Sequence, residues 1–163
     1  MSNLTTIDNS RFVLFPIKYD NLWKMFKHEL ASYWVADEID LSEDRKYWDA
    51  LSDNEKHFIS YVLAYFSSSD SIISENLACN FYSETGLPEA RAFFAMQIAM
   101  ETIHSETYAL LIDTFIRDEK EKQKLFNAIE TIPIVKKKAE WALKWMNSKE
   151  SFESRIIAFA AIE

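Results

Sequence analysis

Helix-breaking residues are almost absent from this chain. Only one glycine and three prolines occur among 163 residues, whereas hydrophobic residues make up 48%. Because glycine and proline oppose helix formation most strongly, their scarcity together with abundant helix formers favours an all-α fold. The length is enough for one domain with a sizeable core. We expect a single helical domain over residues 1–163, with an amino-terminal arm at about residues 1–18.

Charge and cysteine content restrict the partners and the compartment. The formal net charge of −8 argues against phosphate backbones and anionic membranes as partners. The single cysteine, Cys79, cannot form an internal disulfide and suits a reducing cytosol. The first ten residues, MSNLTTIDNS, are polar and are not a secretory signal. We expect a soluble cytoplasmic protein that binds neither nucleic acid nor membrane.

Several helix boundaries are visible in the sequence. Ser52, followed three residues later by Glu55, is typical of a capping box. Pro88 and Pro133 stand where helices can begin, because the first turn needs no amide donor. The charge-rich segment DEKEKQK (118–124) is either a turn or the start of a helix. The main expected helices cover approximately residues 20–37, 45–51, 53–83, 88–117, 133–147 and 151–163.

An acid interrupts the apolar face of the long helix expected at 53–83. The face repeats at the helical period and contains Val62, Phe66, Asp70, Ile73 and Leu77. Asp70 therefore occupies a position where an apolar residue is expected. An ionised carboxylate removed from water without a partner costs several kcal/mol. Asp70 must have a partner there or be neutral.

The helix expected at 88–117 carries a second acid and a histidine on its apolar face. Glu101, His104 and Tyr108 are spaced by three and then four residues, so they lie on one side of the helix. Tyr108, one turn after His104, suits a redox role better than the default of an ordinary core tyrosine. Glu106 points to the opposite side and is expected in solvent. Other members of the face are Phe94, Ile98, Leu111 and Phe115.

A third acid, Glu163, shares a face with Ile156, Phe159 and Ala160. Three acids and a histidine on apolar faces that carry hardly any lysine or arginine require another cation. Hard carboxylate oxygens with one imidazole suit iron or manganese. The unit Glu-x-x-His, here ETIH at 101–104, supplies ligands in ferritin-like di-iron carboxylate bundles. We therefore expect a ferritin-like bundle in which Asp70, Glu101, His104 and Glu163 bind metal.

Other residues have simpler interpretations. His28 and His57 lack acidic neighbours of this kind and are expected at the surface or in structural roles. Cys79 is expected to be a small buried hydrophobic residue. Residues with a helical spacing that are candidates for the core are Trp34, Trp141 and Trp145.

Long segments of the chain resemble the small, radical-generating subunit of class I ribonucleotide reductase, in particular the eukaryotic type. The resemblance covers nearly the whole chain after about residue 10. The segments that carry it are RFVLFPIKYDNLWKMFKHELASYWVADEIDLSED (11–44), SSSDSIISENL (67–77), FFAMQIAMETIHSETYALLIDTFIRD (93–118), FNAIETIPIVKKKAEWALKWM (126–146) and RIIAFAAIE (155–163).

The resemblance implies roles for individual residues. Asp70, Glu101 and His104 would bind the first of two irons, with Glu101 bridging both, and Glu163 would bind the second. Tyr108 matches the tyrosine that becomes a radical when the di-iron centre activates dioxygen. Trp34 matches the tryptophan on the electron-transfer route. The implied partners are a large catalytic subunit, which reduces ribonucleotides to deoxyribonucleotides for DNA replication, and a second copy in a homodimer.

The sequence departs from the family pattern in one respect. The family needs a second Glu-x-x-His for the second iron, and the only one here is at 101–104. Because the final helix also lacks a carboxy-terminal cap, we expect a bundle truncated in mid-helix at Glu163 that is inactive alone. Alternative functions are a di-iron oxidase or oxygenase with its own substrate, an iron-storage bundle, or a metal-free helical partner module.

Overall fold

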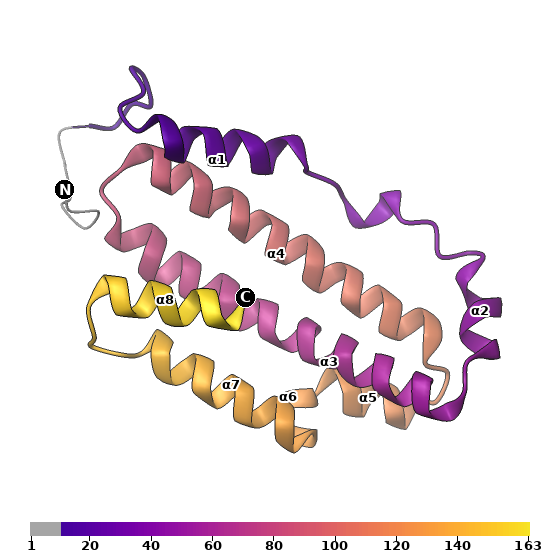
Figure 1. Ribbon diagram of the computed structural model, residues 1–163. Helices are drawn as coiled ribbons and strands as arrows, with labels where there is room; N and C mark the ends of the chain where they lie inside the picture. The colour runs from indigo at the N-terminus through magenta and orange to yellow at the C-terminus, as the bar shows by residue number, and fades with distance from the viewer. Residues whose placement is uncertain (1–10) are drawn as a thin grey trace. The chain divides into compact units, whose positions relative to one another are not determined.

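The computed structural model describes residues 11–163, and all regular secondary structure within them is helical (Figure 1). The part of the expected arm at residues 1–10 lies outside the described residues, and residues 11–19 precede the first helix. In chain order the helices are α1 (Asp20–Ala31), the 3₁₀ turn η1 (Ala36–Glu38), α2 (Asp44–Ala50), α3 (Asp53–Asn76), the π-helical segment η2 (Leu77–Tyr82), α4 (Pro88–Phe115), α5 (Glu119–Phe126), α6 (Ala128–Thr131), α7 (Pro133–Met146) and α8 (Phe152–Ile162).

The described residues group into two compact units. The first contains residues 11–33, 73–101 and 144–163, and the second contains residues 34–72 and 102–143. The boundary falls inside α3 and α4, so each of these helices contributes residues to both units. The organisation as a single domain stays a prediction.

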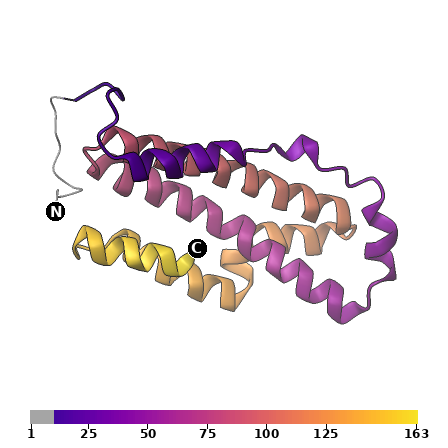
Figure 2. The same cartoon turned by 45° about the horizontal axis from the view of Figure 1, so that its top comes forward.

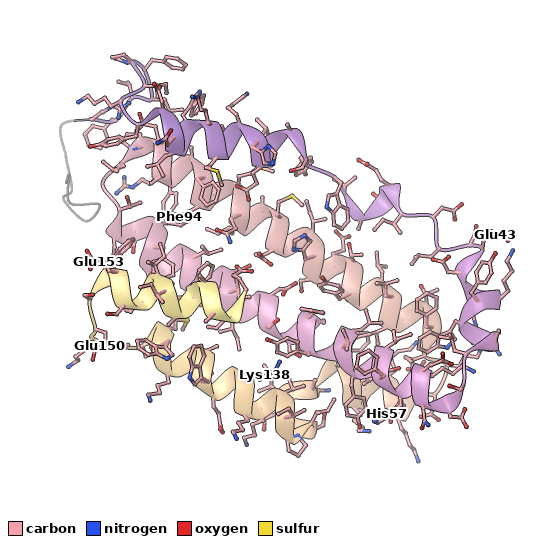
Figure 3. The ribbon with its side chains drawn as sticks, in the orientation of Figure 1. Glu43, His57, Phe94, Lys138, Glu150 and Glu153 are labelled. Carbon is pink, nitrogen blue, oxygen red and sulfur yellow. The ribbon has the colours of Figure 1, made fainter. Side chains whose placement is uncertain are left out.

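Phe81 is the centre of the core in the first unit. Its side chain is fully buried and lies 5.2 Å from the ring of Phe159, 5.5 Å from Phe152 and 6.1 Å from Phe94. The rings of Phe152 and Phe159 meet it edge-on, an arrangement that aromatic pairs favour. Phe94, labelled in Figure 3, belongs to the amino-terminal half of α4, alongside which α1 runs in Figures 1 and 2.

The second unit has a core of its own. It joins the amino-terminal half of α3 and the carboxy-terminal half of α4 to α5, α6 and α7. Beside this core, Trp48 of α2 stacks on Phe115 at 4.9 Å, which attaches α2 to the end of α4. The buried residues of the core are Leu63, Ala64, Ile112, Leu125, Ala128, Ile132 and Val135.

The predicted helix starts are confirmed by hydrogen bonds. The Ser52 N–H group donates to the Glu55 carboxylate at 2.8 Å, and the Glu55 N–H group donates to the Ser52 hydroxyl oxygen at 3.4 Å. This exchange is the predicted capping box. The segment 118–124 resolves as a helix start, because the Asp118 carboxylate accepts the Glu121 N–H group at 2.8 Å and caps α5. Ser151 caps α8 in the same way through the Ser154 N–H group.

Two helices end earlier than predicted. The first ends at Ala31 instead of Asp37, because the Ser32 hydroxyl donates to the carbonyls of His28 and Glu29 and satisfies the last turn. The helix expected to reach Arg117 ends at Phe115, where the Arg45 guanidinium donates to the carbonyls of Thr114 and Phe115. In both cases a side chain donates hydrogen bonds to backbone carbonyls that have no partner within the helix.

Cys79 and Trp141 were wrongly predicted to be buried. Leu77 and Phe81 turn inward, and Cys79, midway between them, falls on the opposite side and is exposed. Trp141 is 42% exposed because Ala139 and Ala142 form the buried face of α7. Trp34 and Trp145 are half-buried. His28 and His57, expected at the surface or in structural roles, are exposed, and the solvent position predicted for Glu106 is confirmed.

Candidate metal centre

Asp70, Glu101 and His104 come together as the sequence predicts. One ligand atom from each residue lies within 4.8 Å of the other two. Asp70 of α3 and His104 of α4 belong to the second unit, and Glu101 precedes His104 by one turn of the same helix. The Asp70 and Glu101 residues are only 5% and 6% exposed, while His104 is half-buried. Two carboxylates and an imidazole thus converge where water has little access.

The surroundings of His104 favour its metal-binding form. Desolvation by the surrounding protein lowers the pKa of His104, which favours the neutral imidazole. A neutral ring nitrogen is the form that binds a metal ion. Asp70 is held beside it, and the Ser69 hydroxyl donates to Asp70 Oδ1 at 3.3 Å. The three groups therefore offer hard oxygen atoms and one nitrogen, a donor set that fits iron or manganese.

Aromatic side chains surround His104 within the second unit. The ring of Trp34 lies 5.8 Å from the imidazole, with 34° between the two planes. The ring of Tyr108 lies 6.4 Å from the imidazole, one turn further along α4. Both residues are half-buried. The two redox candidates, Trp34 and Tyr108, thus both lie next to the metal-ligand candidate His104.

Phe66 lies against Tyr108, a contact that was not predicted, because the sequence placed Phe66 only on the apolar face that contains Asp70. Its ring stacks on Tyr108 at a centroid separation of 5.3 Å and an angle of 22°. Phe66 precedes Asp70 by four residues on α3, and Tyr108 follows His104 by four residues on α4. Because the two helices run antiparallel here, the contact that brings Asp70 to His104 also brings Phe66 to Tyr108. The equal four-residue spacings, from Phe66 to Asp70 and from His104 to Tyr108, were the signal in the sequence that could have indicated this contact.

Glu163 follows α8 and lies in the first unit. Gln97 Nε2 donates to Glu163 Oε1 at 3.1 Å. Desolvation raises the pKa of the Glu163 carboxyl, and the hydrogen bond from Gln97 partly opposes this. Among the described residues, the three-residue group of metal-ligand candidates does not include Glu163. Its role as a ligand of a second metal stays a prediction.

Comparison with known proteins decides the family. The family described as "Ribonucleotide reductase, small chain" matches residues 11–163. The chain belongs to this family. The ribonucleoside-diphosphate reductase small subunit of Dictyostelium discoideum is 61% identical over 157 residues, which are 96% of this chain and 46% of that relative. The chain therefore spans about half the length of such relatives.

Solved structures of similar proteins have the same fold. The Rnr4 homodimer of Saccharomyces cerevisiae is 37% identical, with a TM-score of 0.83 over 97% of this chain and 50% of that chain. The dimanganese(II)-NrdF of Streptococcus sanguinis is 22% identical, with a TM-score of 0.81 over 91% of this chain and 52% of that chain. The predicted all-α, ferritin-like class is confirmed. Across the described residues, every helix is too short or too polar to cross a bilayer.

Proposed function

We propose that this chain carries out the function of the small subunit of ribonucleoside-diphosphate reductase, an oxidoreductase, by forming a radical on Tyr108. The proposal depends chiefly on one observation. Tyr108 lies one turn from His104, whose ring nitrogen comes within 4.8 Å of carboxylate oxygens from Asp70 and Glu101. A storage or purely structural bundle does not need a tyrosine at this position.

Asp70, Glu101 and His104 would hold the first metal ion. Glu101 and Glu163 are the candidate ligands within this chain for a second ion. When bound, the two metals would supply the oxidising power of activated dioxygen. Iron and manganese both suit carboxylate and imidazole ligands, so the donor set alone leaves both metals open to test.

Tyr108 would then lose one electron and its phenolic proton and become a neutral radical. Its half-buried position limits the access of water and reductants to the phenol, and the partly exposed ring of Phe66 stacks on its ring. Trp34, 5.8 Å from the His104 ring, would take part in electron transfer to this site, which carries the oxidising equivalent away from it. Trp34 and Tyr108 are therefore the proposed redox residues, and Asp70, Glu101 and His104 the proposed ligands.

The oxidising equivalent would serve a larger catalytic subunit that converts ribonucleotides to deoxyribonucleotides. A homodimer in the cytoplasm is the proposed state, and the S. cerevisiae relative named above is described as a homodimer. The metal-rich alternative, iron storage, predicts many iron atoms per chain, which a radical-forming site does not need.

Electron paramagnetic resonance (EPR) tests the proposal. The complete product of the reading frame is reconstituted with ferrous iron and dioxygen, and separately with manganese. We expect a tyrosyl radical in the wild type, its loss in Tyr108→Phe with metal still bound, and its retention in Tyr47→Phe, a matched change at a tyrosine that is 66% exposed. A wild-type protein that binds metal and forms no radical contradicts the proposal.

A further inference from the structure

Tyr108 has a second aromatic connection, which leads away from the metal-ligand candidates. Its ring stacks on Phe66 at 5.3 Å, and the ring of Phe66 lies 5.3 Å from that of Tyr65. All three residues belong to the second unit. Two short ring-to-ring steps therefore join the proposed radical residue to another tyrosine. A one-electron oxidant at Tyr108 has a compact path of π-systems to Tyr65.

Tyr65 lies at the end of this path that lines a groove. It lines an apolar groove of about 200 Å³ between α3 and α7, together with Tyr61, Val62, Ile134 and Lys138. Tyr65 is half-buried, while Ile134 on the opposite side of the groove is 59% exposed. Water and small reductants that reach the groove can therefore reach the Tyr65 ring.

A lysine covers the Tyr65 ring. Lys138 Nζ lies 4.1 Å from the ring centroid, on the side of α7 that faces α3 (Figure 3). A cation over the face of an aromatic ring is attracted to its electron-rich surface. The same charge opposes removal of an electron from that ring. Lys138 therefore makes Tyr65 harder to oxidise than an uncovered tyrosine.

We propose that Tyr65 is a second redox-active tyrosine, through which the oxidising equivalent on Tyr108 can escape to the surface groove, and that Lys138 restrains this escape. The inference rests on the proposed function, because Tyr108 must first become a radical. Phe66 serves as the bridge between the two tyrosines and is not itself oxidised. Lys138 is a positioning residue, since it acts through Tyr65.

In the transfer, Tyr65 loses one electron and one proton, and Tyr108 gains one of each. One electron passes from the Tyr65 ring through Phe66 to the Tyr108 radical. The phenolic proton of Tyr65 leaves to water in the groove, and the Tyr108 oxygen takes up one proton. Tyr108 is thereby restored to a phenol, and Tyr65 becomes the radical. A small thiol that enters the groove then gives Tyr65 one electron and one proton, which restores the phenol and leaves a thiyl radical, and the oxidising equivalent is lost from the protein.

The rate of radical loss tests this inference. The complete product of the reading frame is loaded with metal and dioxygen, and the tyrosyl EPR signal is followed with time. In Lys138→Gln we expect the half-life to fall about two- to fivefold, the scale of a partly exposed cation–π contact. A nitroso spin trap should label Tyr65 in this variant, and peptide mass spectrometry locates the adduct.

Two further variants separate the explanations. Lys138→Gln combined with Tyr65→Phe should restore the wild-type half-life, because the residue that gives its electron to the Tyr108 radical is gone. Lys137→Gln, a neighbouring exposed lysine on the same helix, should leave the half-life unchanged. An unaltered half-life in Lys138→Gln, or a shortening that persists without Tyr65, overturns the inference. The absence of any radical in the wild type would instead contradict the proposed function.

Discussion

The Arg11 guanidinium donates two hydrogen bonds of 2.8 Å to the Glu89 carboxylate, one to each oxygen. The Glu89 side chain is 0% exposed and that of Arg11 only 8% exposed. The backbone N–H group of Lys18 donates to the same carboxylate at 2.8 Å. Arg11 also donates to the carbonyls of Leu14 and Pro16, so one side chain folds the segment before α1 and fixes it to the first turn of α4.

Breaking this pair should be strongly destabilising. In Arg11→Met the Glu89 carboxylate stays buried without its main partner, and loss of one member of a buried ion pair costs about 3–5 kcal/mol. We expect a loss of that size in the free energy of unfolding, measured with urea. Arg117→Ala is the matched control: its pair with Asp49 is exposed and long at 3.6 Å, so we expect less than about 1 kcal/mol.

The pH dependence of stability should reveal the same carboxylate. Desolvation alone would raise the pKa of Glu89, but the hydrogen bonds from Arg11 and Lys18 outweigh it and lower the pKa to about 2 from 4.5. Between these values the unfolded chain binds the proton more readily than the folded protein. Stability is therefore complete above about pH 4.5 and falls as the pH drops towards 2, by no more than about 3 kcal/mol from this group.

Glu89→Gln provides the comparison for this pH effect. The amide does not titrate, so urea unfolding of the variant should vary less between pH 4.5 and pH 3 than that of the wild type. Equal pH slopes in the two proteins would show that Glu89 does not carry a depressed pKa.

The apolar faces of the helices predicted the metal-ligand candidates because they follow a strict period. Asp70, Glu101 and His104 each interrupt such a face, and a buried charge without a partner is too costly to leave unexplained. The structure gathers these three residues as expected. The sequence alone did not assign a role to Phe66, since its contact with Tyr108 depends on the register of α3 against α4.

The mistaken positions have identifiable physical causes. Trp141 lies next to the buried Ala142, but about 100° per residue in α7 turns it outward. Cys79 lies in the π-helical segment η2, two positions from both Leu77 and Phe81, and falls on the side opposite to them. The early end of α1 depends on the rotamer of Ser32, and that of α4 on Arg45, which is distant in sequence. Arg11 and Glu89 are 78 positions apart in the sequence, so no local sequence pattern predicts that they form a pair.

Removing a metal-ligand candidate should weaken metal binding more than changing a similar residue nearby. We expect His104→Ala to lower the affinity for Mn²⁺, measured by titration calorimetry, by at least about tenfold, or ~1.4 kcal/mol. Asp70→Asn should act in the same direction because it removes a negative oxygen ligand. His28→Ala and Glu106→Gln alter exposed residues of the same types and should leave the affinity unchanged.

The number of metal ions bound by the 163-residue chain is a separate prediction. A complete two-metal site needs two Glu-x-x-His units, and this sequence contains only the one at Glu101–His104. We therefore expect calorimetry with Mn²⁺, and iron analysis after anaerobic loading, to give at most one tightly bound ion per chain. Glu163→Gln should leave that stoichiometry unchanged, because Glu163 is outside the group formed by Asp70, Glu101 and His104. Two tightly bound ions per chain, one of them lost in Glu163→Gln, would mean that these residues suffice for both positions and that the second Glu-x-x-His is dispensable.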